Sequence, residues 1–92
     1  MILKVFSVYD TAAGAYLQPF FAPTTGLAIR SFSDAVNDPN HQFAKYSHDY
    51  SLYLLAEFND SDASFSPQQE PVRIATATET KNREIDITPS RQ

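Results

Sequence analysis

Two histidines and an aspartate lie close together near the middle of the sequence, at His41, His48 and Asp49. Imidazole and carboxylate groups can bind a metal ion or transfer protons, so this segment is the first candidate for chemistry. The two histidines are seven residues apart, and no firm third ligand accompanies them. We therefore interpret them as surface residues of a polar loop and expect neither a metal site nor a catalytic site.

The segment Asn59-Asp60-Ser61-Asp62 has a faint similarity to a calcium-binding loop. The third oxygen ligand, the glycine and the closing glutamate of that motif are missing, so we predict a hairpin turn instead. The chain has only two glycines and therefore no glycine-rich loop for phosphate, and its serines lack the context of a nucleophile elbow. We expect no enzymatic activity and no cofactor.

The remaining chemistry that the composition offers is the binding of a single-stranded nucleic acid. Such binding needs exposed aromatic side chains that stack on bases and cations that follow the phosphates. Seven Phe and five Tyr are a heavy aromatic load for 92 residues, and this favours association between chains or base stacking. The alternative is that the aromatic residues belong to the core or to a subunit interface and that the cations are ordinary surface residues. The candidate binding residues are Lys4, Tyr9, Tyr16, Arg30, Lys45, Tyr46, Tyr53 and Arg73.

The net charge of −4 bears on this candidate, because acidic residues are concentrated in the middle of the chain. Seven acidic residues lie between Asp34 and Glu70, against the single cation Lys45. An acidic segment repels phosphate, so a nucleic-acid surface on this chain has to be local.

The length of 92 residues allows one domain, which buries only about 60 to 65 % of the surface that the unfolded chain exposes. The absence of cysteine excludes a disulfide framework and a cysteine-ligated zinc site. The first ten residues do not resemble a signal peptide, and no span approaches the roughly 18 apolar residues of a transmembrane helix. We expect a cytoplasmic protein with no membrane partner.

The elements that must position the candidate residues are organised around a helix that follows Pro23-Thr24-Thr25. Thr24 or Thr25 can serve as its N-cap, and the helix ends at Asn37-Asp38-Pro39, because proline cannot continue it. About three turns are expected, with an apolar stripe formed by Ala28, Ile29, Phe32, Ala35 and Val36.

Strands are expected on both sides of this helix, at residues 2–9, 15–21, 51–58, 64–66 and 72–78. We expect the strand at residues 2–9 to be covered on both faces. Pro19 indicates that the strand at residues 15–21 lies at a sheet edge or contains a bulge. Between the helix and the strand at residues 51–58, we expect residues 40–50 to form an ordered loop held by aromatic residues. Alternation in residues 51–58 predicts that Leu52, Leu54, Ala56 and Phe58 share one face. The polar residues 67–71 are predicted to connect the last two strands.

With residues 64–66 counted as a short partner of residues 51–58, the resulting order, β-β-α-β-β, predicts an α+β fold in which one helix covers one face of a small, mainly antiparallel sheet. The opposite face must then be polar, covered by a second chain, or used for binding. We expect a single domain at residues 1–78 that shares its sheet or core in a homo-oligomer, followed by a polar, mobile tail at residues 79–92.

Much of the chain resembles the small non-structural protein of gokushovirus-type microviruses, which are phages with single-stranded DNA genomes. The resemblance covers residues 1–75, and its most specific stretches are YLQPFF at 16–21, AIRSF at 28–32, NDP at 37–39 and EFND at 57–60. It implies a protein outside the virion that acts in genome replication. Such a protein binds single-stranded DNA or switches synthesis from duplex to packaged single strands. No catalytic motif comes with the resemblance.

We therefore expect a non-enzymatic phage protein of the host cytoplasm, at least a dimer, that manages single-stranded viral DNA during replication and its handover to packaging. In this hypothesis the cations among the candidate residues contact phosphates and the tyrosines stack on bases. The alternative is a homo-oligomeric adaptor that docks on a viral or host replication protein, or on a procapsid protein, without touching DNA.

Overall fold

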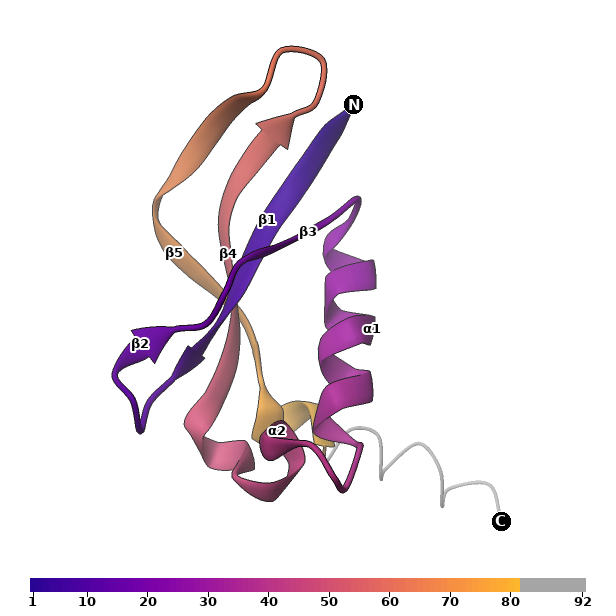
Figure 1. The fold of residues 1–92 in the computed structure, drawn as a ribbon, viewed down its shortest axis with the longest axis vertical. Coiled ribbons are helices and arrows are strands. Elements are labelled where there is room, and N and C mark those ends of the chain that lie inside the picture. The colour runs from indigo at the N-terminus through magenta and orange to yellow at the C-terminus, as the bar shows by residue number, and fades with distance from the viewer. Residues whose placement is uncertain (82–92) are drawn as a thin grey trace.

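The computed structural model describes residues 1–81 as five strands and two α-helices, followed by a helical segment at residues 77–81 (Figure 1). The predicted α+β class and antiparallel sheet are confirmed. The predicted tail lies, from residue 82, outside the described residues. In chain order the elements are β1 (Ile2–Asp10), β2 (Ala15–Tyr16), β3 (Phe20–Ala22), α1 (Thr25–Val36), α2 (Gln42–Lys45), the 3-10 turn η1 (Ser47–Asp49), β4 (Tyr50–Asn59) and β5 (Ser64–Thr76).

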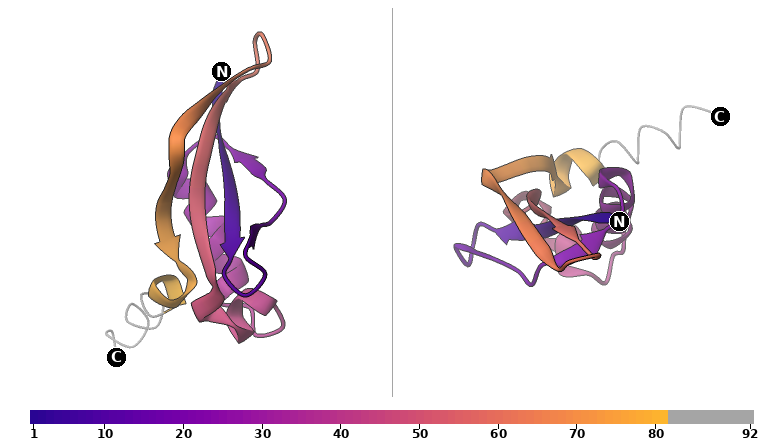
Figure 2. Two further views of the ribbon diagram at one scale, coloured as in Figure 1. Left: turned by 90° about the vertical axis from the view of Figure 1, so that its left-hand side faces the viewer. Right: turned by 90° about the horizontal axis from the view of Figure 1, so that it is seen from above.

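The strands form one curled antiparallel sheet in the order β2-β1-β4-β5, in which β3 also pairs with β1 (Figure 2). The middle of the central strand β1 is buried on both faces, as the lack of clean alternation in residues 2–9 predicts. Val5, Phe6, Ser7 and Val8 are all buried, although consecutive side chains of a strand point to opposite faces.

The two faces of the sheet differ in what covers them. Helix α1 covers the face that carries Phe6 and Val8, and its buried residues Ala28, Phe32 and Val36 complete the core there. We call this the helix face. The opposite side, which we call the open face, carries Leu3, Val5, Ser7 and Tyr9 of β1 together with the residues paired to them.

Helix α1 begins and ends where the sequence predicts. The hydroxyl of Thr24, and not that of Thr25, caps it, because Thr24 Oγ1 accepts a hydrogen bond from the Leu27 amide at 3.1 Å. At the other end the side-chain amide of Asn37 donates to the Ser33 carbonyl at 2.9 Å. The Thr24 hydroxyl thus gives a partner to one of the first-turn amides that have no acceptor within the helix.

The predicted strand 15–21 is divided into β2 and β3. Pro19 lies in the break and has no amide to donate, so pairing with β1 stops on both sides of it. Two bonds of Leu17 hold the break against β1: its amide donates to the Val8 carbonyl at 2.8 Å, and its carbonyl accepts from the buried Ser7 hydroxyl at 2.6 Å.

The predicted loop at 40–50 contains α2 and the 3-10 turn. His41 caps α2, since its Nδ1 accepts from the Phe43 amide at 3.1 Å. Phe43 packs against the buried Tyr50, with 4.5 Å between the ring centroids, so these two aromatic residues hold the segment to the core as expected. Tyr46 does not take part, because it is 55 % exposed.

The last two predicted strands are one continuous strand, β5, and residues 67–71 are not a separate connection. Its pairing with β4 passes from Ala56 and Pro67 to Leu54 and Val72, so residues 68–71 bulge opposite Leu55. The strand ends at Thr76, earlier than the predicted Thr78, where a reciprocal pair of bonds begins a helical turn. Thr76 Oγ1 accepts from the Glu79 amide at 3.1 Å, and Glu79 Oε1 accepts from the Thr76 amide at 3.0 Å.

Candidate nucleic-acid interface

Three tyrosines from three strands meet on the open face. Tyr9 of β1 pairs with Tyr16 of β2, and Tyr53 of β4 pairs with Ser7, so all three side chains lie on the same side of the sheet. The ring centroids are 4.8 Å apart for Tyr9 and Tyr16, 5.6 Å for Tyr16 and Tyr53, and 6.3 Å for Tyr9 and Tyr53. We call these residues the tyrosine cluster.

Tyr16 is the most accessible member of the tyrosine cluster, at 44 % exposed, whereas Tyr9 and Tyr53 are half-buried. Partial desolvation raises the pKa of the Tyr16 phenol above its ordinary value of 10.0, and the neighbouring phenols of Tyr53 and Tyr9 raise it further. The hydroxyl of Tyr16 is therefore neutral at physiological pH, and this part of the cluster carries no negative charge toward a nucleic acid.

Arg73 adds a cation to the same face. It is exposed on β5 and lies directly opposite Tyr53 in the β4–β5 ladder, and no carboxylate among residues 1–81 forms an ion pair with it. The ladder residues of the open face include no Asp or Glu. Asp10 and Glu57 alternate onto the helix face, and Asp60 and Asp62 lie in the β4–β5 turn.

The other four predicted binding residues lie elsewhere. Lys4 is on the helix face, where its ammonium is 3.6 Å from the Glu57 carboxylate. Arg30 is exposed on α1, on the far side of the sheet from the tyrosine cluster. Lys45 ends α2 and Tyr46 follows it, away from the strands. The structure thus brings together Tyr9, Tyr16, Tyr53 and Arg73, and not Lys4, Arg30, Lys45 and Tyr46.

A second aromatic group on the open face is absent from the sequence-based prediction. Phe21, Phe58 and Phe65, from β3, β4 and β5, have ring centroids 4.8 to 6.3 Å apart, and we call them the phenylalanine cluster. The curl of the sheet makes this possible, because β3 and β5 are not neighbours in it. Phe21 is 49 % exposed and Phe65 is 57 % exposed.

The predicted face of Phe58 is wrong because of a β-bulge. Val5 pairs with Ala56 but Phe6 pairs with Leu54, so Leu55 is an extra residue in β4. Leu54 therefore lies on the helix face with Leu52, while Ala56 and Phe58 lie on the open face. Strict alternation from Leu52 to Phe58 would have placed all four on one face, and no glycine marks the bulge in the sequence.

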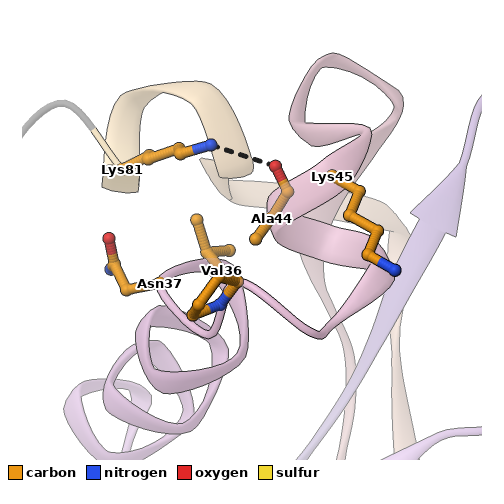
Figure 3. Close-up of a pocket in the computed structure, with 6 residues that line it drawn as sticks. Val36, Asn37, Ala44, Lys45 and Lys81 are labelled. Carbon is orange, nitrogen blue, oxygen red and sulfur yellow. Dashed lines mark hydrogen bonds between the residues drawn. The ribbon is translucent and has the colours of Figure 1, made fainter.

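A hollow of about 380 Å³ lies between the end of α1, α2 and Lys81 (Figure 3). The Lys81 ammonium donates to the Ala44 carbonyl at 3.0 Å, whereas the Lys45 side chain points away from the hollow. Val36, Asn37 and Pro39 supply the rest of the lining. Among residues 1–81, the side chains that line it include neither a carboxylate nor an imidazole.

The two histidines lie in different elements, His41 at the cap of α2 and His48 in the 3-10 turn beside Asp49. His41 uses its Nδ1 as the cap of α2, and among residues 1–81 no three His, Cys, Asp or Glu side chains are grouped as metal ligands. The same part of the chain has no helix that is both long and apolar enough to cross a membrane.

Comparison with known proteins adds one finding. The family model described as Phage ORF5 protein matches residues 3–80, which is most of the 92-residue chain. No curated protein matches the chain. No solved structure matches it either. The matched region contains all of the described strands and helices except Ile2 at the start of β1 and Lys81 at the end of the helical segment, and the chain therefore belongs to the phage ORF5 protein family.

Proposed function

We propose that this phage protein binds single-stranded DNA on its open face, where the tyrosine cluster stacks on bases and Arg73 contacts a phosphate. The observation that carries this proposal is the placement of Tyr9, Tyr16, Tyr53 and Arg73 on one face without a carboxylate in its ladder. A sheet surface that carries aromatic residues and a cation suits single strands, because every base has a face that can stack on an aromatic ring.

The charge distribution supports a single strand over a duplex as the ligand. A duplex presents two phosphate backbones and shields its bases, so proteins hold it mainly through several cations. The open face offers one cation, Arg73, in a chain whose net charge is −4. Stacking then supplies most of the binding energy, at about 1–3 kcal/mol for each base.

The biological role follows from the resemblance to microvirus proteins together with this face. We propose that the protein is a non-enzymatic protein of the host cytoplasm that binds newly made single strands of a microvirus genome, either during replication or before packaging. Base stacking without hydrogen-bond readout gives little sequence preference, as such a role requires.

A second candidate function is favoured by the phenylalanine cluster. Phe21 and Phe65 expose about half of their surface, and exposed apolar patches of this kind often mark protein interfaces. In this alternative the protein is a homo-oligomeric adaptor that docks on a replication or procapsid protein and does not contact DNA.

The test compares two arginines in fluorescence anisotropy with a labelled single strand of about 30 nucleotides. Arg73→Glu places a negative charge beside Tyr53 and is expected to weaken binding at least tenfold. Arg30→Glu makes the same change of charge on α1 and is expected to leave the affinity within about twofold. Equal losses for the two variants would mean that only net charge matters, and would contradict binding on the open face.

A further inference from the structure

The three rings of the tyrosine cluster are in contact, but they are not parallel. The ring planes of Tyr16 and Tyr53 make an angle of 83°, those of Tyr9 and Tyr53 an angle of 76°, and those of Tyr9 and Tyr16 an angle of 60°. Successive stacked bases of a strand lie parallel to one another. A platform for several stacked bases would therefore need parallel rings, and the tyrosine cluster does not provide them.

A base can stack on one ring of this cluster at a time. A base parallel to the ring of Tyr16 stands nearly perpendicular to Tyr53 and is tilted by 60° from Tyr9. The neighbouring rings can then touch this base edge to face, a geometry that aromatic pairs favour, but they cannot stack the next base. Tyr16 is exposed, whereas Tyr9 and Tyr53 are half-buried, so Tyr16 supplies the stacking surface.

Strand β1 holds the rings in this arrangement. Tyr16 and Tyr53 belong to the strands on either side of β1, yet their ring centroids are only 5.6 Å apart. Ser7 of β1 pairs with Tyr53 on this face and is fully buried, and its hydroxyl donates to the carbonyl of Leu17, the residue after Tyr16, at 2.6 Å. The small side chain of Ser7 thus leaves room for the two rings to meet above β1, and their contact limits rotation of either ring.

Arg73 lies on the other side of Tyr53 from Tyr16. The sheet order places β2, β1, β4 and β5 side by side, and Arg73 pairs directly with Tyr53. Paired side chains in an antiparallel ladder start only about 4.5–5.5 Å apart at Cβ, so the long side chain of Arg73 can reach a phosphate next to a base on Tyr16. A strand held in this way crosses the β-strands from β2 toward β5.

We propose that each copy of the protein holds a single base of the strand, stacked on Tyr16 against the edges of Tyr9 and Tyr53, together with one adjacent phosphate at Arg73. This inference rests on the proposed single-strand binding and adds the number of bases in the site. One stack and one phosphate contact make a weak site. Coverage of a long strand then depends on the concentration of the protein.

Competition against the labelled strand of about 30 nucleotides, followed by anisotropy, counts the bases in the site. The competitors are three strands of about five nucleotides with abasic residues: one without bases, one with a single central thymine and one with three central thymines. The single thymine is expected to raise the affinity at least about fivefold over the base-free strand. Three thymines are expected to add no more than about threefold, because they only offer a one-base site three equivalent positions. A larger rise would overturn the inference.

Two substitutions separate the stacking contact from the phosphate contact. Tyr16→Ala is expected to remove the advantage of the one-thymine strand over the base-free strand, whereas Tyr16→Phe keeps the ring and should retain it. Arg73→Gln is expected to weaken both strands by the same factor, because it removes only the phosphate contact. An undiminished advantage of the thymine in Tyr16→Ala would overturn the assignment of the base to Tyr16. The wild-type series decides the number of bases even if Tyr16→Ala misfolds.

Failure of single-strand binding itself gives a different result. If the labelled strand is not bound, or if three thymines compete no better than the base-free strand, then bases do not stack on this protein and both proposals are wrong. If affinity rises steeply from one thymine to three, single-strand binding stands and only the one-base site is wrong.

Discussion

At the residue scale, the side of the sheet on which a side chain lies decides whether it can join the tyrosine cluster. Tyr9, Tyr16 and Tyr53 sit in strands whose pairing brings them side by side, and Arg73 follows from the next strand. Composition identifies aromatic and cationic residues as candidates, but not the face on which each lies. Lys4 carries the positive charge that a phosphate contact needs, but its position in β1 places its side chain on the helix face, where it forms an ion pair with Glu57.

At the residue scale, Tyr16→Ala is expected to weaken single-strand binding by about tenfold, since stacking on one aromatic ring is worth about 1–3 kcal/mol. Anisotropy with the 30-nucleotide probe measures the effect. Tyr46→Ala is the matched control, because Tyr46 is as exposed as Tyr16 but lies away from the open face. If both substitutions weaken binding equally, the tyrosine cluster is not the stacking surface.

Alkaline pH offers a second prediction at the residue scale. Desolvation raises the pKa of the buried Tyr50 phenol above 10.0, and the nearby carboxylates of Asp10 and Asp49 raise it further; the pKa of Tyr16 is raised too. The folded state thus favours the neutral phenols. Their contribution to stability is present below the ordinary pKa and is lost as pH rises through the raised values.

Thermal unfolding at about pH 8 and about pH 11 measures this loss. Tyr50→Phe removes the titrating group of the buried ring, and its unfolding midpoint is expected to fall less between the two pH values than that of the wild type. Absorbance at the phenolate band should show a part of the ionisation delayed to higher pH, and Tyr50→Phe should reduce that part. An equal fall in the variant would contradict the assignment to Tyr50.

At the element scale, local signals located some elements correctly and missed others. Helix α1 has a capping threonine at one end and Asn37-Asp38-Pro39 at the other, and both signals are directly adjacent in sequence to the helix that they delimit. The bulge at Leu55 and the continuity of β5 depend on pairing between strands. Strict alternation within β4 therefore misplaced Ala56 and Phe58, and two prolines in β5 suggested a break.

The sequence carries a local signal at the end of β5 that the prediction of a strand to residue 78 missed. Thr76 and Glu79 have the spacing of a capping box, and the structure shows both of its reciprocal bonds. Buried contacts continue past the predicted boundary at residue 78, since Thr80 is buried and Lys81 reaches the Ala44 carbonyl. A threonine followed three residues later by glutamate would have ended the strand at Thr76.

The cap of α1 supplies an element-scale prediction. Thr24→Ala removes the oxygen that accepts from the Leu27 amide and is expected to lower the free energy of unfolding by about 1 kcal/mol. Thr25→Ala, one residue later, lies inside the helix and should cost nothing, because alanine is the better helix former. Urea unfolding measures both. A larger loss for Thr25→Ala would mean that Thr25 is the cap.

At the scale of the whole molecule, the small core implies a low free energy of unfolding, so the loss of one core side chain is a large fraction of it. Phe6, Leu52 and Val36 are the largest apolar side chains that are fully buried among residues 1–81. Leu52→Ala is expected to cost about 2–5 kcal/mol, a large part of the stability of a domain this size. Leu27→Ala, at an exposed site, should cost less than about 0.5 kcal/mol. Comparable urea midpoints for both variants would contradict this core.

The whole molecule also separates its two aromatic groups. Tyrosines lie toward the β2 end of the open face and phenylalanines toward the β4–β5 turn, so the surface proposed for nucleic acid does not include the phenylalanine cluster. The α+β class and the covering helix were predictable from the order of the elements. The phenylalanine cluster was not, because its rings meet only through the curl of the sheet.

Anisotropy of a labelled 30-nucleotide single strand, at two salt concentrations and against the matching duplex, tests single-strand binding on the open face most directly. We expect tighter binding to the single strand than to the duplex. With one phosphate contact at Arg73, the slope of log K against log salt should be about −0.7 for each bound copy. Absence of binding at low salt, or equal affinity for the duplex, would contradict the account.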